Sequence, residues 1–243
     1  MLNCEQEVNN RVEWIKNLLK KTGAKGIVYG NSGGKDCALT GILSKKATDN
    51  VTGIIMPCES SRNFGIDRDH AYLVGNRFKI NQIEIDLTPV KKAFREVLKD
   101  EVGECDMAYA NINPRLRMTA LYAYAYKNGY LVAGTGNRSE GMMGYFTKWG
   151  DGAYDFNPIS DLTVREVYEL LAYLGAPEEI ITKAPSAGLY EGQTDEGEMG
   201  ITYAAIDDYL LEGKGDPASV FAIEKRIAAT EHKRNPAEVY KRI

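Results

Sequence analysis

The sequence is poor in histidine and has no clustered cysteines, and both features narrow the possible chemistry. Only two His and four Cys occur among 243 residues. The cysteines Cys4, Cys37, Cys58 and Cys105 form no Cys-x-x-Cys pair, so we do not expect a zinc site built from His and Cys ligands. Scattered thiols of this kind are typical of a reducing compartment. We therefore expect a cytoplasmic protein with free cysteines.

The sequence also lacks a long hydrophobic run and an excess of basic residues. No apolar stretch approaches the roughly 20 residues that a membrane-spanning helix needs, and no basic segment followed by an apolar one opens the chain. The formal net charge is −4, whereas broad nucleic-acid-binding surfaces gather Lys and Arg to neutralise phosphates. We expect no membrane insertion, no nucleic-acid partner, and a local basic site for any small anion that binds.

Apolar and helical patterns alternate along the first half of the chain. Hydrophobic residues make up 44% and charged residues 26%, as in ordinary globular proteins, and we expect a single domain over residues 1–243. Four buried strands are predicted from short apolar runs, at 25–30, 51–57, 80–87 and 130–136. Helical spacing is found between them, at 8–22, 35–47, 67–78, 89–99 and 115–127. This alternation predicts an α/β fold in which helices cover both faces of a parallel sheet.

The second half of the chain is less regular. Thr163 and Glu166 form the capping-box pattern at the start of a predicted helix that runs to about Leu174. Two closing helices are expected at about 203–211 and 218–234. The glycine-rich residues 141–152 and the Gly- and Pro-containing residues 184–199 are expected to be loops.

Two adjacent glycines follow the first predicted strand, in Ser32-Gly33-Gly34-Lys35-Asp36. In an open parallel sheet, ligands bind beyond the carboxyl ends of the strands. The glycines allow close approach of a phosphate, and the following helix offers unpaired N–H groups and the positive end of its dipole. Asp36 suits such a site if Mg²⁺ lies between it and the phosphate. A tight turn in which Asp36 caps the helix fits the spacing about equally well.

Two common nucleotide-binding patterns are absent from this turn. A Walker motif needs Ser or Thr after Gly-Lys, but Asp36 follows Lys35, and Gly-x-Gly-x-x-Gly does not occur here. The turn resembles the Ser-Gly-Gly-x-Asp-Ser pyrophosphate loop of the N-type ATP pyrophosphatases, with Cys37 in place of the last serine. Because this change removes a hydroxyl from one phosphate contact, we expect backbone N–H groups to serve there instead.

Further segments resemble those of the ammonia-dependent NAD⁺ synthetases within that superfamily. They are residues 111–118 (Asn-Ile-Asn-Pro-Arg-Leu-Arg-Met), 134–140 (Gly-Thr-Gly-Asn-Arg-Ser-Glu), 144–152 (Gly-Tyr-Phe-Thr-Lys-Trp-Gly-Asp-Gly), 183–189, 193–196 and 232–234. The resemblance spans residues 8–234. It implies a doubly wound, Rossmann-like sheet of five parallel strands. It also implies ATP-dependent amidation of deamido-NAD⁺ with ammonia, which yields NAD⁺, AMP and pyrophosphate in the last step of NAD⁺ biosynthesis.

The resemblance also implies roles for individual residues. The ATP-binding set is Ser32, Gly33, Gly34, Lys35, Asp36, Thr135 and Ser186. The implied ligands of Mg²⁺ are Asp36 and Glu140, whose hard oxygen atoms suit that ion. The implied contacts of deamido-NAD⁺ are Arg115, Lys148, Asp155, His232 and Lys233, and cations in this set suit a pyrophosphate and a carboxylate. Asp36 and Lys148 are the candidate catalytic residues.

Each of these side chains also has an ordinary structural interpretation. Arg115 or Lys148 alone is usually a solvated charge, Glu140 can cap a helix, and the basic residues 232–234 can complement a helix dipole. Their joint order and spacing favour the functional interpretation. The family carries a lysine at a further ATP contact where this chain has Val164, and whether Arg165 replaces that lysine stays open.

The implied reaction activates a carboxylate at the expense of ATP. The carboxylate attacks the α-phosphorus, pyrophosphate leaves, and ammonia displaces AMP, so that catalysis is mainly positioning and charge neutralisation. Nothing in 243 residues resembles an amidase, so free ammonia or a separate glutaminase is the expected nitrogen source. The resemblance also implies a homodimer.

Two alternative functions remain open at the level of sequence. One is a ligase or sulfur transferase that acts on another acceptor, such as tRNA, although the acidic balance disfavours it. The other is an ATP-binding regulatory module without catalysis, which the departures at Cys37 and Val164 suggest.

Overall fold

A parallel sheet lies at the centre of the computed structural model, which describes residues 2–59, 61–183 and 195–242. The strands lie in the order β3-β2-β1-β4. Their bounds are β1 (Gly26–Gly30), β2 (Val51–Ile55), β3 (Asn81–Glu84) and β4 (Tyr130–Ala133). β1 pairs in parallel with both neighbours, so that Ile27 lies opposite Val51 on one side and Leu131 on the other. The central strand is continuously apolar because neither face of it meets water.

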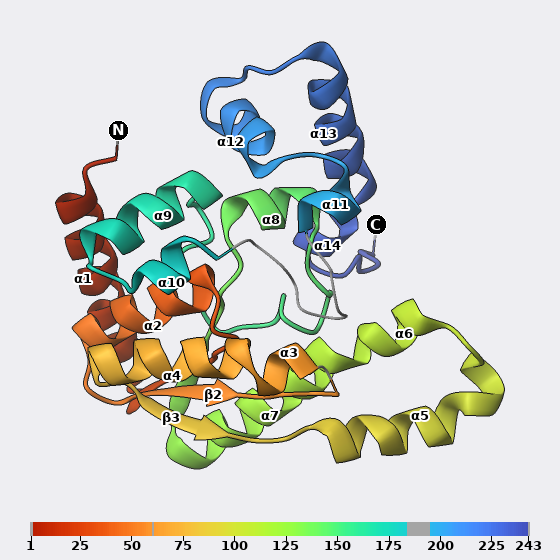
Figure 1. Ribbon diagram of the computed structural model, residues 1–243, viewed down its shortest axis with the longest axis horizontal. Coiled ribbons are helices and arrows are strands. Elements are labelled where there is room, and N and C mark those ends of the chain that lie inside the picture. The colour runs from red at the N-terminus through yellow and green to blue at the C-terminus, as the bar shows by residue number, and fades with distance from the viewer. Residues whose placement is uncertain (1, 60, 184–194, 243) are drawn as a thin grey trace.

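Helices cover both faces of this sheet (Figure 1). Side chains alternate along β1, so Ile27 and Tyr29 enter one core cluster and Val28 enters the other. The helices of the first face are α1 (Cys4–Thr22), α2 (Lys35–Ala47), α4 (Ile66–Phe78), α9 (Val164–Tyr173) and α10 (Glu178–Ile181). On the second face, α7 (Ile112–Asn128) packs against β1 and β4. The predicted α/β architecture with a parallel sheet is therefore confirmed.

The remaining helices extend from this sandwich. α5 (Thr88–Val102) and α6 (Asp106–Ala110) protrude from one end of the sheet, and α3 (Ser61–Phe64) precedes α4 (Figure 1). A third core cluster joins helices from the second half of the chain. These are α8 (Arg138–Met143), α11 (Asp195–Met199), α12 (Tyr203–Glu212) and α13 (Pro217–Ala229), and α14 (Glu231–Arg234) contacts α13.

A full fifth strand is not found among the described residues, which form a sheet of four. Beside β4 there is one isolated parallel bridge, between Ala133 and Phe156. The side chain of Asp155 accepts a hydrogen bond from the backbone N–H of Val132 at 2.8 Å, so that N–H is not available to a strand carbonyl. Pro158 follows shortly and has no N–H to donate. The expectation of five strands is corrected to four plus this bridge.

Local sequence signals set several helix boundaries as expected, and one predicted helix is divided. Gly23 ends α1 with a φ of 70°, and the Thr163 hydroxyl caps α9 by accepting from the N–H of Glu166. The single helix expected at 218–234 breaks at Thr230. Its hydroxyl donates to the carbonyl of Arg226 at 2.8 Å, and this local bond competes with regular helix geometry.

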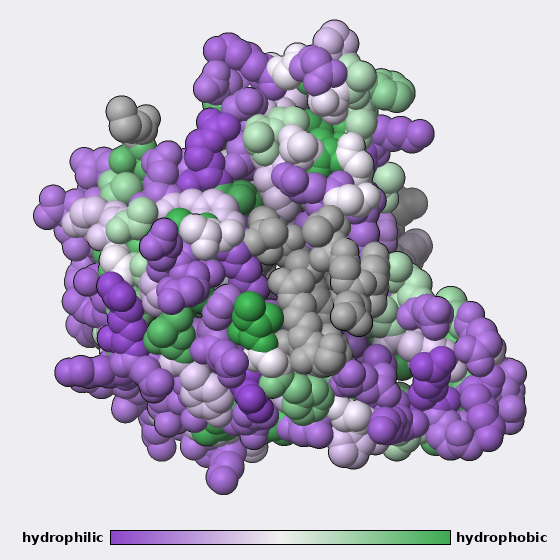
Figure 2. All heavy atoms as spheres, in the orientation of Figure 1, coloured by the Kyte–Doolittle hydropathy of each residue, from purple (hydrophilic) through white to green (hydrophobic). Residues whose placement is uncertain are grey.

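The described cysteines, Cys4, Cys37, Cys58 and Cys105, are all free. In the described ranges, no helix has the length and apolar character to cross a membrane. The face drawn in Figure 2 is mostly hydrophilic, with small hydrophobic spots that are separated from one another.

Candidate active site

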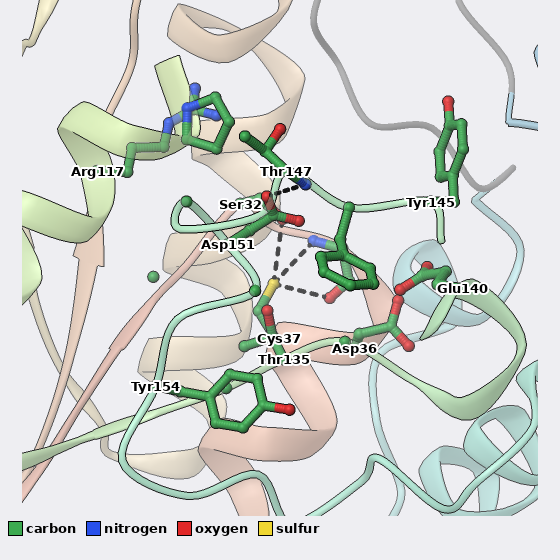
Figure 3. Close-up of a pocket in the computed structure, with 18 of the residues that line it drawn as sticks. Ser32, Asp36, Cys37, Arg117, Thr135, Glu140, Tyr145, Thr147, Asp151 and Tyr154 are labelled. Carbon is green, nitrogen blue, oxygen red and sulfur yellow. Dashed lines mark hydrogen bonds between the residues drawn. The ribbon is translucent and has the colours of Figure 1, made fainter. Parts of the chain in front are cut away.

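A cleft of about 1060 Å³ opens where the strand order reverses. β2 lies on one side of β1 and β4 on the other, so the loops that follow β1 and β4 diverge at the carboxyl edge of the sheet. Ser32, Gly34 and Asp36 from the first loop and Thr135 from the second line this cleft. Figure 3 shows that these segments meet around one space. The structure thus places the predicted phosphate-binding turn at the sheet's topological switch point.

Gly33 fixes the shape of the turn. Its φ of +68° lies in the left-handed region, and a Cβ added there would lie 2.0 Å from the carbonyl oxygen of Asp67. The N–H of Gly33 donates to the side chain of Asn31 at 3.1 Å, and the ammonium of Lys183 donates to the Gly33 carbonyl at 3.0 Å. Gly34 is different, because a Cβ there would meet only Ser32 Oγ, at 3.4 Å. Gly33 therefore serves packing, whereas Gly34 leaves room on the cleft side.

Cys37 is built into this turn. Its Sγ lies 3.2 Å from both the N–H and the carbonyl oxygen of Gly34, and 3.3 Å from Ser32 Oγ (Figure 3). These contacts close the first turn of α2 by one half of a capping box, in which the side chain of Cys37 accepts from the N–H of the N-cap residue Gly34. The thiol therefore stabilises the turn as a cap, so the sequence departure at this position does not disrupt the turn.

Asp36 and Glu140 face one another across the cleft, and the ammonium of Lys35 lies between them. Lys35 Nζ is 2.7 Å from Asp36 Oδ2 and 3.5 Å from Glu140 Oε1. The amide of Asn137 donates to Asp36 Oδ1 at 3.0 Å, and its oxygen accepts from the N–H of Glu140 at 2.9 Å. The two predicted metal ligands, which lie in the first turns of α2 and α8, are thus joined through Lys35 and Asn137.

Burial shifts the pKa values of Glu140 and Lys35. Burial raises the pKa of Glu140 to about 8, with repulsion by Asp36 adding to the effect and Lys35 opposing it. Burial by itself would lower the pKa of Lys35, but Asp36 and Glu140 together raise it above its ordinary value. The carboxylates therefore require a cation between them, and Lys35 supplies one.

The donor set fits Mg²⁺. Across the described part of the chain, no three His, Cys, Asp or Glu side chains gather as a metal centre. Magnesium is usually held by one or two carboxylates together with substrate phosphates and water, and the pair of Asp36 and Glu140 beside the phosphate-binding turn matches that pattern.

Three cleft residues were not assigned from the sequence. Asn137 is 1% exposed, and it links the two carboxylates because its side-chain amide donates to Asp36 and its backbone N–H donates to Glu140 Oε2. The Asn-x-x-Glu capping pattern at the start of α8 is the signal that could identify it. Lys183 reaches Asp67 Oδ1 at 2.8 Å as well as the turn. Arg117 donates to the carbonyl of Met56 at 3.0 Å and also lines the cleft. Arg117 and Lys183 lie within the family-like segments 111–118 and 183–189, but tertiary packing brings them to the cleft, so the sequence pattern alone does not assign their contacts.

Val164 lies in the core, and Arg165 does not replace the lysine that the family carries at an ATP contact. Val164 is 5% exposed and packs with Met143 and Tyr203 in the third cluster. Arg165 pairs with Asp208 at the surface and does not line the cleft. The cations near the turn are instead Lys35 and Lys183.

The residues expected to contact deamido-NAD⁺ divide between the cleft and its surroundings. Lys233 lines the cleft and donates to the carbonyls of Gly144 and Phe146, each at 2.8 Å. Burial lowers the pKa of Lys233. Lys148 donates to the backbone carbonyl of His232, and both residues line a separate hollow of about 400 Å³.

Arg115 and Asp155 also lie outside the cleft lining. Arg115 is exposed and donates to the carbonyl of Lys148 at 3.3 Å. It therefore lies next to the hollow that Lys148 lines. Asp155 is held by Val132 and by the hydroxyl of Tyr122, at 3.3 Å. Ser186, the remaining predicted ATP contact, lies outside the described residues.

Comparisons with known proteins show which family this chain belongs to. The NAD synthase family matches residues 7–237. The chain is 46% identical over 241 residues to the NH(3)-dependent NAD(+) synthetase of Carboxydothermus hydrogenoformans, covering 98% of each chain. Among solved structures, it resembles an NMN synthetase from Francisella tularensis, with a TM-score of 0.92, 35% identity and 99% of each chain covered.

It also resembles an NH3-dependent NAD synthetase from Campylobacter jejuni that was solved in complex with the nitrate ion. The TM-score is 0.80 and the identity 28%, with 99% of this chain and 100% of the other covered. These matches extend over nearly the whole length of the chain. The chain belongs to the NAD synthase family.

Proposed function

We propose that this protein amidates deamido-NAD⁺ with ammonia and ATP, and that it releases NAD⁺, AMP and pyrophosphate. The observation that carries the proposal is the cleft at the switch point, where the glycine turn, the start of α2 and the pair of Asp36 and Glu140 face the same space. Membership of the NAD synthase family supports the choice of substrate.

The pyrophosphate part of ATP is assigned to the turn after β1. The first N–H groups of α2 have no partners within the helix and carry the positive end of its dipole, so they attract an anion. Gly34 leaves space for a phosphate on the cleft side, and the exposed Ser32 supplies a hydroxyl. Thr135, which is separated from the end of β4 by Gly134, lines the same cleft and is assigned to the same nucleotide. Ser186 is proposed as a further contact.

Asp36 and Glu140 are the proposed ligands of Mg²⁺, which when bound would neutralise charge on the phosphates. Asn137 holds both groups in place, because it donates to Asp36 and caps the helix that carries Glu140. Removal of either carboxylate would leave the other beside Lys35 without its partner. These residues therefore position the departing pyrophosphate.

The reacting carboxylate must approach the α-phosphorus opposite the pyrophosphate and away from bulk water. Once the acyl-adenylate has formed, ammonia attacks the acyl carbon and AMP leaves with one carboxylate oxygen. Arg117 and Lys233 are half-buried cations at the cleft wall, and they are suited to hold anionic groups of the substrate. Arg115, Lys148, Asp155 and His232 lie beyond the wall, and we assign them to the outer part of the dinucleotide.

A second candidate is amidation of the corresponding mononucleotide. The observation that favours it is the TM-score of 0.92 to the structure of an NMN synthetase, against 0.80 to an NAD synthetase. The chemistry at the carboxylate and the α-phosphorus is the same for both substrates. Only the outer contacts would differ, because a mononucleotide has no adenosine half to reach Lys148 and His232.

The remaining parts of the proposal concern partners and place of action. We propose free ammonia as the nitrogen source, with a separate glutaminase as a possible supplier, and we place the enzyme in the cytoplasm. A homodimer is supported by exposed apolar side chains on α5 and α7, such as Val97 at 80% and Tyr126 at 91% exposure. Light scattering on the purified protein would give the mass of the assembly, and a monomer at micromolar concentration would contradict the dimer.

The experiment is an assay of products with purified protein, ATP, Mg²⁺ and ammonium chloride. Deamido-NAD⁺ and nicotinate mononucleotide are supplied in parallel, and kcat/KM is measured for each. NAD⁺, AMP and pyrophosphate in equal amounts support the first candidate, and a higher kcat/KM for the mononucleotide selects the second. ATP binding without turnover of either substrate would favour a regulatory module, and the D36N variant is the inactive control.

A further inference from the structure

The ammonium of Lys35 occupies the space between the two proposed metal ligands. Lys35 is 6% exposed although it is the first residue of α2. Its Nζ lies 2.7 Å from Asp36 and 3.5 Å from Glu140, and 5.6 Å from the centre of the Tyr203 ring. A buried lysine needs such partners, because an unpaired ammonium is costly to remove from water.

A divalent ion would compete with this ammonium for the same oxygen atoms. Magnesium binds carboxylate oxygen at about 2.0–2.1 Å, whereas the ammonium is 2.7 Å from Asp36 Oδ2. Two cations that share one carboxylate in a poorly solvated cleft repel each other strongly. The metal and the ammonium therefore cannot both keep these positions.

Lys35 also belongs to the turn that would receive ATP. It directly follows Gly34, and both residues line the same cleft. Phosphates that dock on Gly34 give the ammonium a new anionic partner within reach of its flexible side chain. The carboxylates are then left to the divalent ion.

We propose that Lys35 is a tethered cation that fills the divalent-ion site in the nucleotide-free protein and moves to the phosphates when ATP binds. Metal binding is therefore weak without nucleotide and becomes strong with it. This inference rests on the proposed function only in assigning ATP to the cleft. If Lys35 served solely as a fixed ion pair, its ammonium would keep its place between Asp36 and Glu140 after ATP binds.

The test uses Mn²⁺ alone as a probe of the nucleotide-free protein, and free Mn²⁺ is counted by electron paramagnetic resonance. Wild type is compared with K35M and K35Q, which remove the ammonium but retain a side chain of similar length. K183M is the matched control, since it removes another ammonium beside the turn that does not contact Asp36 or Glu140. We expect Mn²⁺ to bind at least tenfold more tightly to K35M and K35Q than to wild type, and within about twofold of wild type to K183M.

Equal Mn²⁺ affinity in wild type and in folded Lys35 variants would overturn the inference, as would an equal gain in K183M. Circular dichroism establishes folding. If neither Lys35 variant folds, wild-type crystals soaked with Mn²⁺ and a non-hydrolysable ATP analogue decide the matter. An anomalous peak between Asp36 and Glu140 with the ammonium moved to phosphate supports the inference, and an unmoved ammonium contradicts it.

The outcome can be separated from that of the proposed function. Tighter Mn²⁺ binding by the variants together with no NAD⁺ formation by wild type would keep the role of Lys35 and reject the amidation. NAD⁺ formation by wild type with unchanged Mn²⁺ binding by the variants would do the reverse.

Discussion

The two glycines of the turn after β1 should respond differently to substitution by alanine. At Gly33, an added Cβ would lie 2.0 Å from the Asp67 carbonyl oxygen and 3.0 Å from the Ala71 nitrogen, both backbone atoms of α4. The φ of +68° adds strain for any residue with a Cβ. At Gly34, φ is −93° and the nearest atom is a side-chain hydroxyl at 3.4 Å.

The magnitudes follow from these contacts. A left-handed conformation costs an L-residue about 1–2 kcal/mol, and forcing a methyl group into packed atoms costs about 1–3 kcal/mol. We therefore expect G33A to lower the free energy of unfolding by about 2–5 kcal/mol. G34A should change it by less than about 1 kcal/mol, since alanine adopts this φ readily and loses less entropy than glycine on folding.

The KM for ATP should respond to the substitution at Gly34 even though stability does not. A methyl group on Gly34 would occupy the space assigned to a phosphate, so we expect G34A to raise the KM for ATP at least tenfold with little loss of stability. Urea denaturation and steady-state kinetics on both variants measure these effects. A stable G34A variant with an unchanged KM for ATP would refute the assignment of phosphate to this turn, and a G33A variant as stable as wild type would refute the packing argument.

Three further predictions concern the residues around the turn. The pKa of Glu140 is raised to about 8 by burial and by Asp36, so the favourable neutral form of this side chain is lost as pH rises through 8. Without metal, the Tm of E140Q should therefore exceed that of wild type by an amount that grows between pH 5 and pH 9. A constant difference in Tm would argue against the raised pKa. C37S should keep activity within about threefold while C37A loses about 1 kcal/mol of unfolding free energy, because only serine restores the bonds to Gly34; equal stability of both in urea would exclude the capping role. N137A should lose about 1 kcal/mol as a helix cap and need more Mg²⁺ for half-maximal activity, since Asp36 loses its donor; an unchanged Mg²⁺ requirement would show that Asn137 acts on the helix alone.

Local sequence signals predicted the parts of the site that depend on chain neighbours. The turn at 32–36 was predicted because glycines, a preceding strand and a following helix are adjacent in sequence, and the topology then places this edge of the sheet at the cleft. Lys183 reaches the same turn from 150 residues away, and no periodicity or motif expresses such a contact. The resemblance predicts Lys35 as an ATP contact. Its position between two carboxylates depends on Glu140, which lies on a different helix.

The difference in the number of strands has an equally local cause. The side chain of Asp155 accepts a hydrogen bond from the Val132 N–H at 2.8 Å. That bond replaces a contact that a fifth strand would make, so the sheet stops at β4 except for one bridge. An acidic side chain that imitates a strand carbonyl leaves no signal in hydrophobic periodicity.

The transfer of oxygen from the substrate carboxylate to AMP tests the account most directly. Deamido-NAD⁺ labelled with oxygen-18 in both carboxylate oxygens is incubated with the protein, ATP, Mg²⁺ and ammonium, and the AMP is analysed by mass spectrometry. Adenylation of the carboxylate predicts one oxygen-18 atom in each AMP, with unlabelled pyrophosphate. Unlabelled AMP, or the formation of ADP with labelled phosphate, would contradict attack at the α-phosphorus.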